Sequence, residues 1–154
     1  MVGIGGVFVI GILAALLLPA IARAINRARV TACANNLSML WKMQNVYMSR
    51  FGGPMKSMPL ETGEEFWLAL ERTQPPLVDP MMREVFLCPV REDGETCDYR
   101  GPAVPVSRLG GSDPVGADKP DNHGGKGGNL LRKSGDVVEL DESEFQQLDR
   151  LLRP

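Results

Sequence analysis

The sequence has no charged side chain in its first 22 residues, from Met1 to Ala22, and no acidic side chain before Glu61. A core helix in a chain of 154 residues normally keeps one polar face, whereas this segment has none. As a helix the segment would span about 33 Å, which matches a bilayer core of about 30 Å. It therefore predicts a membrane-spanning helix over residues 1–22.

A cleavable signal peptide is the main alternative for this segment. Ala20-Ile21-Ala22 has the small-x-small pattern of a cleavage site, but no basic region precedes the apolar run. The run is also longer than the apolar part of a usual signal peptide. A retained helix is therefore the preferred interpretation.

A strong charge of one sign is also missing, because 17 basic and 19 acidic residues give a net charge of −2. Nucleic-acid-binding domains normally show a basic face, so no nucleic-acid partner is expected. The glycine-rich stretch Gly124-Gly125-Lys126-Gly127-Gly128 lacks the Gly-Lys-Ser/Thr ending of a phosphate loop. No residue stands at a spacing that specifies a catalytic triad with the single histidine, His123. We therefore expect a protein that is not an enzyme.

Cysteine is scarce, with only Cys33, Cys88 and Cys97 present. Cys88 and Cys97 enclose a polar, glycine-containing stretch, residues 89–96, that is typical of a turn. In an oxidising compartment we expect a disulfide to close this loop, with two unpaired thiols as the alternative. A metal site is least favoured, because this pair and one histidine do not supply four good ligands. Cys33 falls in a helical pattern and is expected to behave as a small apolar residue.

Proline and glycine are absent from Ala24 to Met48, where apolar residues recur mostly at steps of three or four. This spacing predicts that the helix continues as an amphipathic rod over residues 23–50 and stops at Phe51-Gly52-Gly53-Pro54. The whole helix, about 48 residues, would be about 70 Å long. Pro19 lies inside it and permits a kink. The recurring apolar residues are Ile25, Val30, Cys33, Leu37, Leu40, Trp41 and Tyr47.

Residues 51–154 are expected to form a loop-rich globular head, because most of the glycine and proline lies there. Turn and capping signals divide this head into short helices and strands. The chain is therefore predicted to be α+β, with a long N-terminal helix packed on a small antiparallel sheet. The predicted elements are a helix over 63–72 that begins with a capping box at Thr62, strands over 84–87 and 97–100, a hairpin of 129–133 and 136–140 around Ser134-Gly135, and a final helix that starts at 141–144.

The run Gly11-Ile12-Leu13-Ala14-Ala15-Leu16-Leu17-Leu18-Pro19-Ala20, with the basic residues after it, resembles the N-terminal helix of type IV pilins and type II secretion pseudopilins. Phe86-Leu87-Cys88-Pro89 and Asn122-His123-Gly124-Gly125 resemble motifs of a pseudopilin-like family with a C-terminal His…Gly signature. Three departures stand out. The family usually carries a basic leader ending in glycine, and the sequence has none before this run. Alignment on the first run places Val2 where the family carries a glutamate, and Ser134-Gly135 replaces the family's Asp-Gly.

The resemblance implies a type IV pilin-like fold and a structural subunit of a type IV pilus-like or type II secretion pseudopilus filament. The implied partners are the membrane and copies of the chain itself or related pilin subunits. The implied location is the inner membrane, single-pass with an extracytoplasmic head, and then an extracellular or periplasmic filament. The alternative is a membrane-anchored extracytoplasmic binding domain that does not polymerise. The residues expected to carry assembly are Val7, Phe8, Ile12, Leu13, Leu16, Leu17 and Pro19.

A loop rich in glycine, aspartate and proline is expected from Gly110 to Gly128. Carboxylate and carbonyl oxygens in such a loop can bind Ca²⁺, as the major pseudopilins that the chain resembles do. The candidate ligands are Asp118, Asp121 and Asn122, although their spacing matches no EF-hand. The alternative is a turn-rich surface loop in which His123 hydrogen-bonds the backbone.

Overall fold

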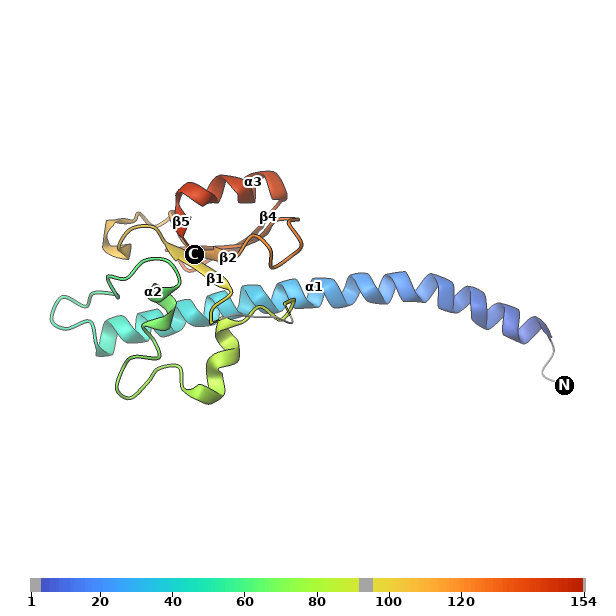
Figure 1. The fold of residues 1–154 in the computed structure, drawn as a ribbon, viewed down its shortest axis with the longest axis horizontal. Helices are drawn as coiled ribbons and strands as arrows, with labels where there is room; N and C mark the ends of the chain where they lie inside the picture. The colour runs from blue at the N-terminus through green and yellow to red at the C-terminus, as the bar shows by residue number, and fades with distance from the viewer. Residues whose placement is uncertain (1–3, 92–95, 154) are drawn as a thin grey trace.

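One long helix organises the molecule. The computed structural model describes residues 4–91 and 96–153, with residues 4–12, 14, 149 and 150 described by backbone only. The helix α1 (Ile4–Arg50) runs through Pro19 without a break and curves gently (Figure 1). It ends before Gly52, where a Cβ atom would lie 2.4 Å from the carbonyl oxygens of Met48 and Ser57. The long helix and its stop at the glycines are therefore confirmed.

The head contains a five-stranded antiparallel sheet with the strand order β4-β3-β2-β1-β5. The α+β prediction is confirmed. The hairpin predicted around Ser134-Gly135 is also confirmed, as β3 and β4. Gly135 has a φ of 96°, in the left-handed region that glycine adopts at no steric cost. The strands are β1 (Tyr99–Pro102), β2 (Pro114–Asp118), β3 (Gly128–Arg132), β4 (Val137–Leu140) and β5 (Leu152–Arg153).

One face of the sheet packs on α1, which Figure 1 shows passing beneath the sheet, with the segment that follows α2 on the opposite side of the helix. Cys33, Leu37, Leu40 and Trp41 form a buried stripe on the helix, at the spacing of one helical face. The amphipathic rod is thus confirmed from Cys33 onward, whereas Ile25 is 48% exposed. The stripe belongs to one buried cluster with Phe66, Trp67, Phe86, Tyr99, Val115 and Leu131.

The other face of the sheet is covered by α3 (Glu142–Gln146) and the 3₁₀ helix η3 (Gln147–Arg150). Asp141 caps α3, because its carboxylate accepts a hydrogen bond from the backbone N–H of Glu144 at 2.9 Å. The predicted start of the final helix is confirmed. The residues buried in this second cluster are Ala117, Leu130, Phe145, Leu148 and Leu152.

Two local predictions on the α1 side of the head are wrong. The strand predicted over 84–87 lies almost entirely within the 3₁₀ helix η1 (Pro80–Phe86), because Asp79 accepts hydrogen bonds from the next two free backbone N–H groups. The helix predicted over 63–72 is only α2 (Glu65–Leu68), and its N-cap, Glu64, makes no side-chain capping bond. Backbone hydrogen bonds beyond α2 continue as turns and not as an α-helix. The burial of Phe66 and Trp67, and not helix propensity, therefore orders this segment.

The sheet is also more extensive than predicted. β2 lies inside the stretch 110–128 that was expected to be a loop, and β1 begins two residues after the predicted strand at 97. A further 3₁₀ turn, η2 (Val106–Arg108), connects the two strands. β2 contains Pro114 and Gly116, both unusual in strands. Gly116 is required there, because a Cβ atom would lie 2.5 Å from Cζ2 of Trp67.

We expect Gly116→Ala to lower the free energy of unfolding by about 1–3 kcal/mol, because the added methyl must displace the buried Trp67 ring. The measurement is urea unfolding followed by tryptophan fluorescence. Gly111→Ala is the matched control, since no neighbouring atom lies within 4 Å of its Cβ position. Equal effects of the two substitutions would contradict the prediction.

Candidate functional site

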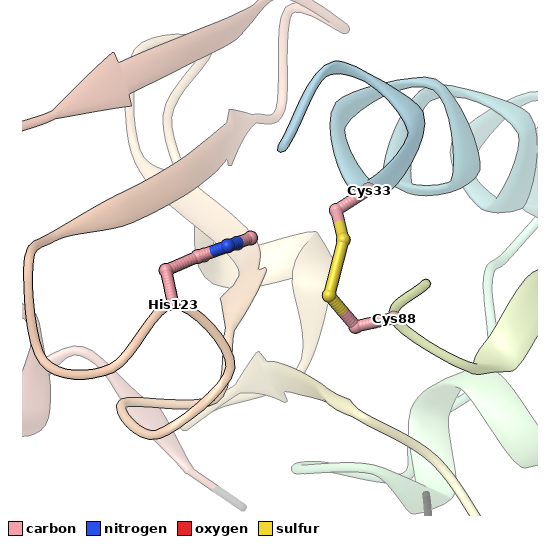
Figure 2. A group of neighbouring side chains, drawn as sticks. All are labelled: Cys33, Cys88 and His123. Carbon is pink, nitrogen blue, oxygen red and sulfur yellow. A yellow bond between two sulfur atoms is a disulfide. The ribbon is translucent and has the colours of Figure 1, made fainter. Parts of the chain in front are cut away.

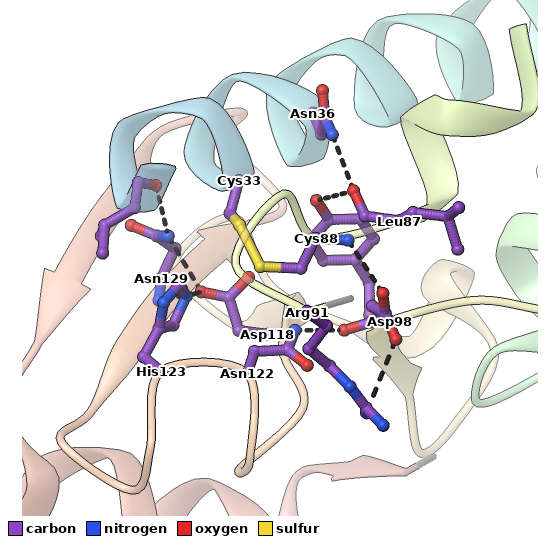
Figure 3. The surroundings of a disulfide bond; sticks show 12 residues. Cys33, Asn36, Leu87, Cys88, Arg91, Asp98, Asp118, Asn122, His123 and Asn129 are labelled. Carbon is purple, nitrogen blue, oxygen red and sulfur yellow. Dashed lines mark hydrogen bonds and ion pairs between the residues drawn. A yellow bond between two sulfur atoms is a disulfide. The ribbon is translucent and has the colours of Figure 1, made fainter. Parts of the chain in front are cut away.

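A disulfide joins the long helix to the head. Cys33 of α1 is bonded to Cys88, with Cα atoms 5.3 Å apart across a sequence separation of 55 (Figure 3). Both cysteines are buried, and Cys97 is a free, buried thiol. The predicted pairing of Cys88 with Cys97 is therefore wrong. Cys33 lies on the stripe of α1 that faces the head, so helix packing, rather than proximity in sequence, selects the partner.

The surroundings of Cys97 keep its thiol unreactive. Its thiol donates a hydrogen bond to the carbonyl oxygen of Tyr99, with a sulfur-to-oxygen distance of 3.6 Å. Burial raises the pKa of the Cys97 thiol to about 12. The group is therefore protonated at neutral pH, and a buried thiol of this kind is a poor nucleophile and a poor metal ligand.

Asp98 holds the segment that carries Cys88. Its carboxylate oxygen Oδ2 accepts a hydrogen bond from the backbone N–H of Cys88 at 2.9 Å, and its own N–H donates to the carbonyl of Phe86 at 2.8 Å. The side-chain amide of Asn122 donates to the carbonyl oxygen of Asp98 at 2.7 Å. Arg91 forms an ion pair with the other carboxylate oxygen at 3.6 Å. These bonds connect Cys88 to the loop that carries His123.

A second buried carboxylate, Asp118, lies at the end of β2. Its Oδ2 atom accepts hydrogen bonds from the backbone N–H of Asn129 at 2.8 Å and from the Asn129 side-chain amide at 2.9 Å. The same amide nitrogen donates to the carbonyl oxygen of Val30 at 3.1 Å, which ties β3 to α1. A buried carboxylate is costly unless it is paired and hydrogen-bonded. These contacts satisfy Oδ2, whereas the buried Oδ1 atom has no hydrogen-bond partner among the described residues.

His123 completes this cluster. Its Nε2 atom lies 2.6 Å from Oδ2 of Asp118, and its side chain is only 7% exposed. The expectation that His123 bonds to the backbone is therefore wrong. Because the carboxylate accepts, we assign the proton to Nε2, which leaves Nδ1 as the basic nitrogen. Within the described residues, the buried Nδ1 atom has no hydrogen-bond partner.

A cavity of about 400 Å³ opens beside His123. Its lining includes the apolar side chains of Val30 and Val90 and two charged residues, Lys126 and Glu139. Val30 lies one turn before Cys33, and Val90 lies two residues after Cys88. Neither cysteine lines the cavity, but His123 does, and its ligand atom lies within 4.8 Å of both sulfur atoms of the disulfide.

The side chains of the three candidate calcium ligands do not point toward a common position. Asp118 is buried and bonded to Asn129 and His123, and the Asn122 side-chain amide points to Asp98. Asp121 is exposed to solvent. Calcium binding by Asp118, Asp121 and Asn122 stays a prediction.

The residues expected to carry assembly lie at the free end of α1. Leu16 and Leu17 are 68% and 53% exposed, Leu13 is 52% exposed, and Pro19 is also exposed. The side chains of Val7, Phe8 and Ile12 lie outside the described residues. Across the part of the chain that the structure describes, no helix has the length and apolarity needed to cross a membrane.

Comparison with protein-family models, curated proteins and solved structures gives no match for this chain.

We expect Cys88→Ser to lower the free energy of unfolding by about 4 kcal/mol, because it opens a covalent loop spanning 55 residues of sequence separation. Cys97→Ser is the control and keeps the disulfide, so we expect a smaller loss of about 1 kcal/mol. Thiol titration in denaturant should find one thiol in the unreduced wild type, Cys97. Three thiols before reduction would contradict the disulfide assignment.

The calcium prediction is tested by thermal melts in CaCl₂ and in EGTA. Binding to the native state alone raises the melting temperature. We expect Asp121→Asn to reduce any such rise, because Asp121 is the exposed candidate ligand. Equal melting temperatures in the two buffers contradict calcium binding.

Proposed function

We propose that the protein is a structural subunit of a type IV pilus-like or pseudopilus filament, assembled through the free end of α1. The observation that carries the proposal is a row of exposed, large apolar side chains on the helix before the head begins. Each of them is between 48% and 68% exposed. The row consists of Leu13, Leu16, Leu17, Leu18, Ile21 and Ile25.

Water is an unfavourable environment for this surface. Burying a leucine or isoleucine side chain contributes about 1.5–3 kcal/mol, so covering six partly exposed ones contributes on the order of 5 kcal/mol. The described side chains of residues 15–29 are exposed on every face of the helix, so one flat partner cannot cover them. A bundle of identical helices or a lipid bilayer surrounds a rod on all sides, and either supplies the missing contacts.

The charge pattern supports a rod that passes from lipid into a bundle. No charged residue precedes Arg23, and Arg27 and Arg29 follow it closely. Basic side chains at this place can reach lipid head groups while the segment before them stays in the apolar phase. The charge pattern alone does not orient the chain. The proposed location, the inner membrane with the head outside the cytoplasm and then a filament of copies of the chain or related pilin subunits, follows from the resemblance to pilins.

The second candidate is a membrane-anchored binding domain that does not polymerise. The cavity beside His123 favours it, since it brings an apolar wall together with Lys126 and Glu139. The two candidates differ in what the exposed part of α1 contacts. In the filament it contacts other copies of the chain, and in the anchored binding domain it contacts lipid alone.

We expect Leu16→Lys to abolish filaments, because a charge buried among apolar helices costs several kcal/mol unless it is paired. The measurement is electron microscopy of filaments isolated from cells that produce the full chain. The matched control is Leu60→Lys, which places the same charge at an apolar position of the head that is 71% exposed. Control filaments should form normally.

Two outcomes argue against the filament. Monomers of the wild type that insert into lipid vesicles and never associate would support the anchored binding domain instead. Filaments that tolerate Leu16→Lys as well as Leu60→Lys would show that α1 is not the assembly element.

A further inference from the structure

Three side chains of metal-binding chemistry meet between α1 and the head. The ligand atoms of Cys33, Cys88 and His123 all lie within 4.8 Å of one another. They come from three separate segments, the long helix, the segment after η1 and the loop after β2, as Figure 2 shows. In that view the imidazole extends from its loop toward the disulfide.

The histidine is held as metal-ligating histidines are held. Such a ligand usually donates its second ring N–H to a carboxylate, which fixes the ring and makes the free nitrogen more basic. Here Nε2 of His123 lies 2.6 Å from the buried carboxylate of Asp118, which Asn129 in turn holds with two hydrogen bonds. Nδ1 is buried and has no hydrogen-bond partner among the described residues.

We propose that Cys33, Cys88 and His123 form a site for a thiophilic cation of the Zn²⁺ class when the disulfide is reduced. A dithiol or phosphine reductant supplies two electrons, and the two sulfurs take up two protons as the S–S bond breaks. The cation then replaces both thiol protons and accepts the lone pair of His123 Nδ1. The same two sulfurs cannot serve both states, so disulfide and metal exclude one another.

The geometry suits such an exchange. On a tetrahedral Zn²⁺ ion with Zn–S bonds of about 2.3 Å, two thiolate sulfurs lie about 3.8 Å apart. Breaking the S–S bond lets Cys33 and Cys88 separate by side-chain rotation, while their Cα atoms, 5.3 Å apart, stay close. The fourth ligand would be a water molecule or a small anion, which reaches the ion through the cavity lined by Val30, Val90 and His123.

The remaining cysteine provides an internal control. Cys97 is buried, is bonded to the carbonyl of Tyr99, and is not part of the group of converging ligand atoms. If the cation bound any available thiol, removal of the Cys97 thiol would weaken binding. Binding at the proposed site should not change.

The test is a Co²⁺ titration of the full chain in detergent, after reduction with a phosphine and again in the oxidised state. The reduced protein should bind one Co²⁺ ion and show the thiolate-to-cobalt charge-transfer band and the visible bands of a tetrahedral site. Zn²⁺ should displace the cobalt. The oxidised protein should show neither band. Equal spectra in both states, or no binding after reduction, would overturn the proposal.

Variants then assign the ligands. We expect His123→Gln to weaken Zn²⁺ binding at least tenfold and Asp118→Asn to weaken it about 10–100-fold, since Asp118 acts through the histidine. Cys33→Ser and Cys88→Ser should each remove about half of the charge-transfer intensity, and Cys97→Ser should leave it unchanged. Near-ultraviolet circular dichroism shows whether each serine variant has folded. If one has not, the deciding measurement is the Zn²⁺ affinity of the reduced His123→Gln protein, in which all three cysteines are present. Unchanged affinity in that variant, or loss of the band in Cys97→Ser, would refute the site.

Discussion

The head holds α1 through one stripe of side chains, and the positions of the other elements follow from that contact. The stripe begins at Cys33 and continues through Leu37, Leu40 and Trp41, all buried. Before Val30, the described side chains of the helix are exposed. The helix therefore changes near Val30 from side chains exposed on every face to a single buried stripe. This change marks the edge of the head. The same contact places Cys33 opposite Cys88 and Asn129 beside Val30.

Much of this architecture could be predicted because its signals are local. The helix follows from a long run without proline or glycine, the β3–β4 hairpin from Ser134-Gly135, and the final helix from the cap at Asp141. β2 could not be predicted in this way. Its glycine, Gly116, lowers strand propensity but makes room for Trp67, which comes from a segment about fifty residues away. Tertiary packing therefore overrides the local preference.

The site was harder to predict, because its residues meet only in the folded chain. Cys88 and Cys97 are close in sequence, and that closeness suggested the wrong pair. The informative signal was the spacing of Cys33 with Leu37 and Leu40, which places the thiol on the face of α1 that meets the head. Asp118 was predicted to be a loop ligand for calcium, whereas it ends a strand and orients His123.

The covalent bond between helix and head also changes how the chain responds to mechanical tension. A pull along α1 reaches Cys33 and passes directly to Cys88, so the intervening residues carry no load. Without the bond, a sequence separation of 55 could extend by roughly 180–200 Å. Those residues include Phe66 and Trp67, which are buried against the sheet. An intact disulfide therefore keeps this part of the core from being drawn out when the rod is stretched.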